Sequence, residues 1–317
     1  MSVLRCSLAL GVLAFLTCVA AHAAEKKLDP VREWNVSGNF KGKDARMNIS
    51  GAACTTKLKS CLLVNDEENY AQFFDIEGTT LLPGDPVTLR EKAEGDPDGE
   101  GAAYHDDHFY VTGSHGRPRH SVEKSSVPSY VVFRFHKDKP SDVEASTRLH
   151  DVIHDSPGIG PFFNDLLDRN GVNIEGIAVK GGRMYLGFRG PSTEGHAFIL
   201  SVDTAAVFTK KDPVDAKVAK VKLGPTTGIR DLAAVDGGLL ILSGPVNDQN
   251  VIPAIFFWND QTGDLKLIGE LVIPAKLKEA KAETLLILPD PTIEAYRALI
   301  MFDGAENGAP TEYSVPR

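Results

Sequence analysis

One position of a recurring motif carries polar residues that could do chemistry. The motif appears as NISGAAC, DGEGAAY, NIEGIAV, GIRDLAA and KAETLLI, which begin at Asn48, Asp98, Asn173, Gly228 and Lys281. Its third position holds Ser50, Glu100, Glu175, Arg230 and Glu283. Carboxylates, a guanidinium and a hydroxyl are groups that bind cations, hold anions or move protons. A shared site is expected if the fold brings these positions together.

A second set of polar residues lies at the end of the strand that follows each motif. Each motif opens an apolar strand, crosses a polar turn and returns, and the turns HDDH, KGGR and VDGG hold the Asp and Gly that tight turns need. The start of the first strand and the end of the second lie at the same edge of a hairpin. We expect that edge to carry also Asp66, Ser114, His115, Arg189, Ser243 and Asp303.

The repeat predicts the fold. Further strand-like runs follow each hairpin, so a unit of roughly 50 residues holds about four short strands, as in a β-propeller blade. Five motifs predict an all-β, five-bladed β-propeller whose first strands line the axis. The wide gap before Glu175 includes residues 117–170, which we interpret as an insertion with a short helix, PFFNDLLDR, near residues 150–170. A degenerate sixth blade in this gap is the alternative.

The two ends of the chain are predicted to close the ring. Only one strand, TEYSVP, follows the last hairpin, which leaves that blade without an outer strand. The N-terminal stretch REWNVSG would supply this strand and cover open sheet edges.

Residues 1–23 have the pattern of a secretory signal peptide, with Arg5 before an apolar run and Ala-His-Ala at the end. Residues 24–317 are then expected to form one propeller domain that is periplasmic or secreted. Cys54 and Cys61 flank a hairpin turn, and an oxidising compartment would allow a disulfide between them. The formal net charge of −9 is unsuited to nucleic acid, and no later run is long and apolar enough to span a membrane.

The charges expected on the axis allow two interpretations. The carboxylates of Glu100, Glu175 and Glu283 outnumber the single guanidinium of Arg230, and carboxylate and hydroxyl oxygens suit Ca²⁺. Alternatively, Arg230 pairs with these carboxylates and simply closes the channel. The sequence leaves open whether a cation or the Arg230 guanidinium fills the axis.

Two other patterns contain residues that bind metals or catalyse reactions. The stretch from His105 to His108 reads HDDH, but it occupies a hairpin turn on the opposite face, which favours a plain turn. Ser114 and His115 are adjacent, and adjacent side chains on an extended chain point in opposite directions. They are therefore not expected to act as nucleophile and base for each other. An esterase that uses Ser114 is a further option.

Four segments carry a resemblance to a known family: NISGAAC with CLLVNDEENYAQFF, EGAAYHDDHFYVTGSHGR, NIEGIAVKGGRMYLGFRGP and GIRDLAAVDGGLLILSGP. The chain resembles an exported bacterial β-propeller family that is catalogued as a domain of unknown function. More distantly, it is similar to phytase-like and esterase-like propellers and to the calcium-activated nucleotidases, or apyrases. The nucleotidase resemblance implies one axial Ca²⁺, bound in this chain by Ser50, Glu100, Glu175 and Glu283. Arg230 departs from the small hydroxyl residue expected in that ring.

The leading functional hypothesis is a propeller whose central site binds or hydrolyses a small anionic ligand such as a phosphoester. A metal on the three glutamates would polarise the substrate or activate water. Asp66 or His115 would act as the base, and Arg189 and Arg117 would hold the anion.

The alternative hypothesis is a non-catalytic binding or scaffold propeller. Its central charges are structural, and a protein or glycan partner binds its loops or the insertion. Fold alone does not decide between these hypotheses, because propellers serve many functions.

Overall fold

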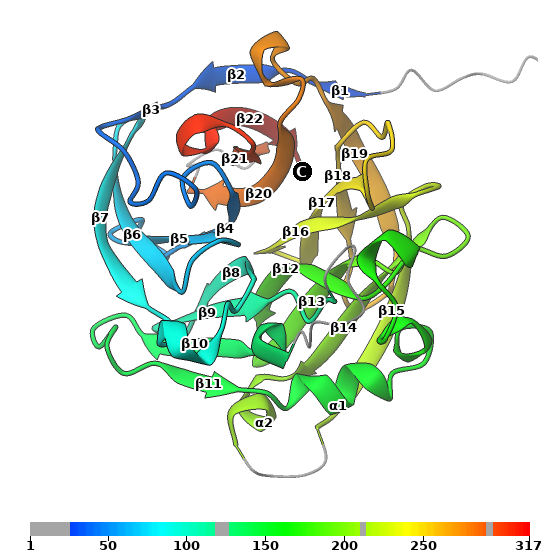
Figure 1. Cartoon of the computed structure of the whole chain (residues 1–317). Coiled ribbons are helices and arrows are strands. Elements are labelled where there is room, and N and C mark those ends of the chain that lie inside the picture. Colours follow the sequence, from blue (N-terminus) through cyan, green and yellow to red (C-terminus); the bar gives the residue numbers. More distant parts are fainter. Residues whose placement is uncertain (1–25, 118–126, 210–213, 290–293) are drawn as a thin grey trace, which may run out of the picture.

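Five β-sheets stand around one central axis (Figure 1). The computed structural model describes residues 26–117, 127–209, 214–289 and 294–317, so the predicted signal peptide lies outside the described residues. The arrangement confirms the five-bladed β-propeller. The six-bladed alternative is wrong, because the strands between the second and third motifs complete the second blade.

Each blade is built from strands that follow one another along the chain. Blade 1 contains β4 (Ile49–Cys54), β5 (Cys61–Asn65), β6 (Tyr70–Glu77) and β7 (Thr80–Thr88). Blade 2 contains β8 (Gly99–His105), β9 (His108–Gly113), β10 (Val132–His136) and β11 (Glu144–Ser146). Blade 3 contains β12 (Asn173–Lys180), β13 (Arg183–Gly190), β14 (His196–Asp203) and β15 (Ala216–Lys222). Blade 4 contains β16 (Thr227–Val235), β17 (Gly238–Pro245), β18 (Ala254–Trp258) and β19 (Leu265–Leu271), and blade 5 contains β20 (Lys281–Leu288), β21 (Ala295–Asp303) and β22 (Thr311–Pro316).

The core lies between the blades. Buried apolar side chains form five clusters, one in each gap between neighbouring sheets. Blade 2 shows how the sequence produces this division: Phe109 and Phe135 pack toward blade 1, whereas Tyr110 and Val132 pack toward blade 3. Successive side chains of a strand point to opposite faces, so a run of apolar residues serves two interfaces at once.

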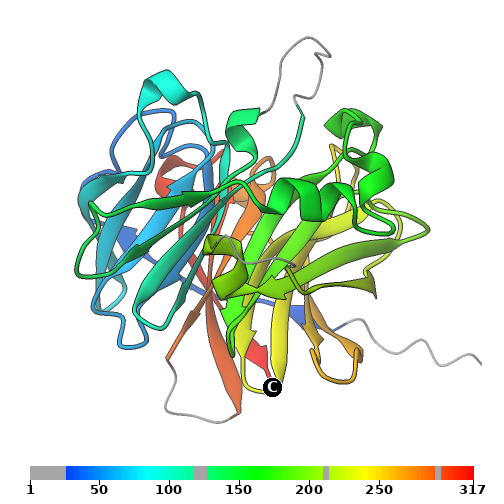
Figure 2. The same cartoon turned by 90° about the horizontal axis from the view of Figure 1, so that it is seen from below.

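The segment between the second and third motifs differs from its prediction. Its α-helix is α1 (Leu149–His154), at the upper rim in Figure 2, and not PFFNDLLDR. The latter stretch forms two 3-10 turns, Gly160–Phe162 and Leu167–Arg169. The extended backbone of Leu166, with φ −68° and ψ 150°, separates the two turns and prevents a continuous helix.

The other short elements are few in the described part of the chain. A second α-helix, α2 (Thr204–Phe208), begins at Asp203, whose side chain accepts a hydrogen bond from the backbone N–H of Ala206. Four further 3-10 turns cover Lys92–Glu94, Val127–Ser129, Ala275–Leu277 and Glu306–Gly308. None of the described helices is long and apolar enough to cross a membrane.

Cys54 and Cys61 are directly opposite each other in the β4–β5 register and form a disulfide. The bond joins the two strands of blade 1 next to their connecting turn.

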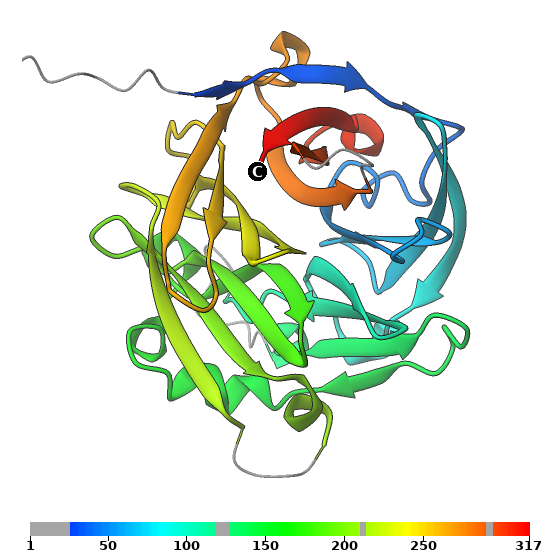
Figure 3. The same cartoon turned by 180° about the vertical axis from the view of Figure 1, so that it is seen from behind.

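An N-terminal strap closes the ring on its outside (Figure 3, blue). Strand β2 (Pro30–Glu33) pairs with β22 and gives blade 5 an outer strand from the N-terminal segment, although only Arg32 and Glu33 of the predicted stretch REWNVSG take part. The strap also contains β1 (Lys27–Leu28), which pairs with β19, and β3 (Asn35–Val36), which pairs with β7. It therefore covers the outer edges of blades 4, 5 and 1, and Trp34 anchors it through a 2.8 Å hydrogen bond from Nε1 to the buried Glu312.

The innermost strands approach one another so closely that glycine is required between them. A Cβ added to Gly51 would lie 2.6 Å from Cα of Gly101, and a Cβ added to Gly101 would lie 2.6 Å from the carbonyl oxygen of Glu175. Gly176 meets the backbone of Asp231 in the same way, at 3.0 Å. Three successive interfaces near the axis are thus backbone against backbone.

Gly101→Ala is therefore expected to destabilise the propeller by more than about 1–3 kcal/mol, the usual effect of overpacking, because the nearest atom to the new Cβ is the backbone carbonyl oxygen of Glu175, which cannot move aside. The free energy of unfolding in urea measures this. Gly84→Ala on the outer strand β7 is the matched control, since its Cβ would meet nothing closer than 3.3 Å. Equal losses for the two variants would contradict a packed axis.

Candidate functional site

The third residue of every motif is an extra residue in its strand. In blade 3, Ile174 pairs with Phe188 and Gly176 pairs with Gly187, so Glu175 has no partner across the hairpin. The same shift in the other four blades leaves unpaired Ser50, Glu100, Arg230 and Glu283. Such β-bulges bend the strand and redirect one side chain. They explain how a charged residue is accommodated in an otherwise apolar strand at the axis.

Blade 3 carries a second bulge that faces the first. Asn173 pairs with Gly190 and Ile174 with Phe188, which leaves Arg189 as an extra residue of β13. The two bulged residues of this blade, Glu175 and Arg189, form an ion pair.

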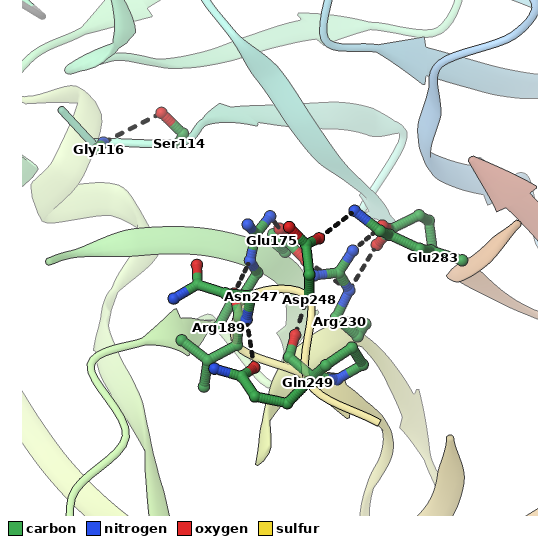
Figure 4. Close-up of polar contacts among 12 residues, drawn as sticks. Ser114, Gly116, Glu175, Arg189, Arg230, Asn247, Asp248, Gln249 and Glu283 are labelled. Carbon is green, nitrogen blue, oxygen red and sulfur yellow. Dashed lines mark hydrogen bonds and ion pairs between the residues drawn. The ribbon is translucent and has the colours of Figure 1, made fainter. Parts of the chain in front are cut away.

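Two glutamates and two arginines form a connected network across blades 3, 4 and 5 (Figure 4). Glu175 bridges the arginines: it pairs with Arg189 through one oxygen, and its other oxygen lies 2.9 Å from Arg230 Nε. Arg230 also pairs with Glu283, to whose Oε2 its Nε donates a hydrogen bond at 2.8 Å. Arg189 Nε donates to the carbonyl oxygen of Val246 at 2.6 Å. Both guanidinium groups are therefore already engaged by the protein.

The network is buried, with its side chains between 3 and 8% exposed. Burial lowers the pKa of Arg230 to about 10, although Glu175 opposes that shift, so the guanidinium stays charged at neutral pH. Removing one member of such a group leaves an uncompensated buried charge on its partner.

Blades 1, 2 and 5 contribute carboxylates to the same face, and we call this group the acidic half-ring: Asp66, Asp98, Glu100 and Asp303. Asp66 follows β5, Asp303 ends β21, and Asp98 precedes the bulged Glu100 by two residues. Glu100 is buried, whereas the other three are half-buried and reach solvent. One carboxylate oxygen of Asp66 is buried without a hydrogen-bond partner.

The acidic half-ring holds protons more tightly than ordinary carboxylates do. Burial raises the pKa of Asp66 to about 8, with further contributions from the charges of Asp98 and Asp303. Burial likewise raises the pKa of Asp98 to about 6, although a hydrogen bond with Ser114 opposes it. The pKa of Glu100 lies well above its usual range, because burial and the neighbouring Asp98 and Glu175 all disfavour its charge. A nearby positive charge would therefore stabilise the ionised form of each of these carboxyl groups.

The predicted catalytic candidates Ser114 and His115 form hydrogen bonds with different groups. Ser114 is fully buried, and its hydroxyl accepts a 3.0 Å hydrogen bond from the backbone N–H of Gly116 (Figure 4). The His115 ring is also fully buried, stacks on Tyr130 and hydrogen-bonds the carbonyl of Gly113 through Nδ1 at 3.1 Å. Burial lowers the pKa of His115 to about 4, so the ring is neutral.

The two remaining serines have different surroundings. Ser50 is the buried, bulged residue of β4 and stands beside the close approach of Gly51 and Gly101. Ser243 donates a hydrogen bond to the carbonyl oxygen of Ala254 within blade 4, at 3.1 Å, and is structural. Arg117 donates to the carbonyl of Asn164 at 3.1 Å and braces the helical segment.

Sequence reasoning missed two carboxylates at this site. Asp98 occupies the first position of its motif, and the same position holds the buried Asn173 in blade 3, so that column was an available signal. Asp231 follows the bulge in blade 4, where blades 1 to 3 have glycine. Its carboxylate accepts hydrogen bonds from the backbone N–H groups of Leu232 and Leu285, at 2.7 and 2.6 Å, and thereby joins blade 4 to blade 5.

The predicted metal ligands do not converge. Glu175 and Glu283 face arginines, and Glu100 lies with the acidic half-ring. Within the described ranges, no three His, Cys, Asp or Glu side chains are placed so that they could hold a metal ion. On the axis, the guanidinium of Arg230 lies between the two glutamates that a cation would need.

The fold and the bulged inner strands define a five-bladed propeller with a charged axis. Residues 136–312 match the family described as "Protein of unknown function (DUF3616)", and the chain belongs to this family. This confirms the family resemblance that the sequence showed. No curated protein matches the chain in sequence.

Solved structures resemble the chain only distantly. A nidogen–laminin complex is 13% identical, with a TM-score of 0.45 over 81% of this chain and 76% of that one. The Malassezia sympodialis allergen Mala s 1 is 14% identical, with a TM-score of 0.42 over 84% of this chain and 77% of that one. An exo-β-1,3-galactanase from Phanerochaete chrysosporium is 8% identical, with a TM-score of 0.47 over 92% of this chain and 64% of that one.

The central network yields a stability prediction. Arg230→Gln is expected to lower the free energy of unfolding by about 3–5 kcal/mol, because it leaves Glu175 and Glu283 buried without their shared cation. Lys276→Gln is the control, since Lys276 pairs with Glu33 at the surface, where such a pair contributes only about 0–1 kcal/mol. Urea unfolding measures both, and similar small losses would mean that the network is not stabilising.

The acidic half-ring yields a pH prediction. Asp66, with its pKa of about 8, keeps a proton in the folded state that the unfolded chain loses near pH 3.9. The folded state therefore binds more protons, and stability falls as the pH rises toward 8. His115 acts in the opposite direction only below about pH 6.5, where the unfolded histidine is protonated. The melting temperature should thus fall between pH 6.5 and 8.

Asp66→Asn should flatten this slope, since asparagine does not titrate. Asp75→Asn, an exposed residue on β6, is the control and should leave the slope unchanged. A melting temperature that rises from pH 6.5 to 8 in the unmodified protein would contradict the raised pKa of Asp66.

Proposed function

We propose that this chain is an exported binding propeller whose acidic half-ring takes a positively charged group, an ammonium or a guanidinium, of a small molecule or peptide. One observation carries the proposal: the central face gathers seven carboxylates against two arginines. The carboxylates are Asp66, Asp98, Glu100, Glu175, Asp231, Glu283 and Asp303, and the arginines are Arg189 and Arg230. Lys281, the nearest lysine, pairs with a further acid, Asp248, at 3.5 Å. The excess negative charge is met by bound protons or by a cation.

An anionic ligand is less well supported. The sequence assigned the anion to Arg189 and Arg117, but Arg189 is paired with Glu175 and the carbonyl of Val246, and Arg117 donates to the carbonyl of Asn164. Arg230 is likewise paired with glutamate and with a backbone carbonyl. A phosphoester would have to displace Glu175 or Glu283 from buried ion pairs while facing the carboxylates of the acidic half-ring. Both changes are unfavourable.

An organic cation is better supported than a metal ion. The carboxylates of the acidic half-ring come from three blades and are not gathered around one point in the described residues. A metal requires several oxygens at bonding distance, whereas an ammonium or guanidinium donates three to five hydrogen bonds over a wider region. Asp66, with a buried oxygen that lacks a partner, offers one acceptor for such a donor.

Binding is favoured over catalysis by the same geometry. Ser114 and His115 are buried and contact different groups, so they do not form a nucleophile–base pair. The network of Arg230, Glu175 and Glu283 supports the view that part of the central charge is structural, and the acidic half-ring then provides the ligand-binding part. Export is supported by the signal-peptide pattern of residues 1–23 and by the disulfide of Cys54 with Cys61.

The test is calorimetric titration of the protein with spermidine and with the tripeptide Ala-Arg-Ala, at low salt and pH 7.5. Binding of either amine is expected, and Glu100→Gln or Asp66→Asn should weaken it at least about tenfold, because a hydrogen bond to a charged group contributes about 1.5–3 kcal/mol. Asp75→Asn is the control and should bind as the unmodified protein does.

Inorganic phosphate and 4-nitrophenyl phosphate serve as anionic probes in the same titration. If phosphate binds and the amines do not, the central site is specific for anions and the proposal is wrong. If the protein hydrolyses 4-nitrophenyl phosphate and Asp66→Asn abolishes this activity, the protein is a hydrolase and the proposed binding function is wrong.

A further inference from the structure

Two histidines lie one turn apart on helix α1, in the sequence HDVIHD. His150 and His154 are four residues apart, so their side chains leave the same face of the helix with Cβ atoms about 5–6 Å apart. The helical backbone continues at both ends, because the flanking Arg148 and Asp155 also have helical φ and ψ angles. Helices bind metal ions through two histidines at this spacing.

An aspartate follows each histidine and fixes its tautomer. His150 Nδ1 lies 2.8 Å from Asp151 Oδ1, and His154 Nδ1 lies 2.9 Å from Asp155 Oδ1. An ionised carboxylate only accepts hydrogen bonds, so Nδ1 carries the hydrogen in both rings. In the neutral imidazole the lone pair is then on Nε2. Metal-ligating histidines are commonly oriented by a carboxylate in this way.

Packing holds both rings in place while leaving them accessible. The side chains of His150 and His154 are 41% and 54% exposed. Each meets the ring of Phe163 edge-on, with centroid distances of 5.0 and 5.7 Å. Phe163 itself is buried in the cluster between blades 2 and 3. One rigid aromatic ring therefore positions both imidazoles, which lowers the conformational freedom lost on binding.

We propose that His150 and His154 bind a divalent transition metal ion of the Zn²⁺ or Cu²⁺ class through Nε2, with Asp151 and Asp155 as positioning residues. Imidazole nitrogen suits these ions, whereas Ca²⁺ and Mg²⁺ prefer oxygen ligands. Two protein ligands leave the remaining positions to water. Among the described residues, no three His, Cys, Asp or Glu side chains are grouped to hold a metal ion. The proposed site is therefore an open surface site with two protein ligands, unlike a structural metal centre with four. It does not depend on the proposed central ligand.

Blade 2 contains the competing candidate. His105, His108 and His136 are in register across β8, β9 and β10. The ring of His136 is less available, because the backbone N–H of Asp138 donates to its Nδ1 at 3.2 Å and occupies the lone pair of that nitrogen. The rings of His108 and His136 also stand perpendicular, with centroids 5.2 Å apart.

The test is calorimetric titration of the whole protein with ZnCl₂ and with CuCl₂ in a buffer without chelators. One ion per chain is expected at the α1 site. His150→Gln and His154→Gln should each weaken binding at least about tenfold, and Asp151→Asn combined with Asp155→Asn should weaken it by about 10–100-fold. His108→Gln is the matched control and should bind as before. The electron paramagnetic resonance spectrum of the Cu²⁺ complex should show two nitrogen ligands.

Unchanged binding in both His150→Gln and His154→Gln would overturn the proposal. Loss of binding in His108→Gln alone would place the ion on blade 2 instead, and would also overturn it. The melting temperature of each variant without metal shows whether it is folded. The aspartate variants keep both imidazoles against Phe163, so they test the site even if a histidine substitution unfolds α1.

Discussion

The narrow axis is the constraint on which the rest of the structure depends. Strands β4, β8, β12 and β16 meet backbone to backbone, with Gly51, Gly101 and Gly176 at the contacts. In every blade a bulge adds one polar residue to the innermost strand at this level. Five polar residues are therefore forced into one small, poorly solvated region, where each charge must find a partner. Arg230 pairs with two of them, Glu175 and Glu283, whereas Glu100 of blade 2 lies in the acidic half-ring.

The architecture could be predicted from the sequence, because the signals of each repeat, its turns and its apolar strands, depend on residues that are close together in the chain. Hairpin turns with Asp and Gly, and apolar runs that bury both faces, are visible in each unit, so the five blades and the closing strand from the N-terminus could be inferred. The helix in the segment before blade 3 could not. Pro161 suggested a helix start, but the extended Leu166 interrupts the stretch, and Leu149–His154 forms the helix because Leu149 and Ile153 are buried between blades.

The candidate site was only partly visible in the sequence. Alignment of the motifs identified the five bulged residues and the second row with Asp66, Arg189 and Asp303, because position in a repeat determines position around the axis. Pairing could not be predicted, since it depends on which side chains turn toward each other: Arg189 faces Glu175, and Ser114 turns away from His115. The role of Asp231 could not be predicted, because it depends on the backbone of Leu285 in the neighbouring blade. Asp98 was missed although its column of the motif holds polar residues in two blades.

The strap has a consequence for biogenesis. Its strand β2 pairs with β22, which follows every other described strand along the chain, so the outer edge of blade 5 cannot be completed before Thr311–Pro316 has been synthesised. A product that stops short of Thr311 would keep the edges of the first and last blades open to other chains. Completion of the ring is thus a late event in the synthesis of the chain, because it requires two segments that lie far apart in the sequence.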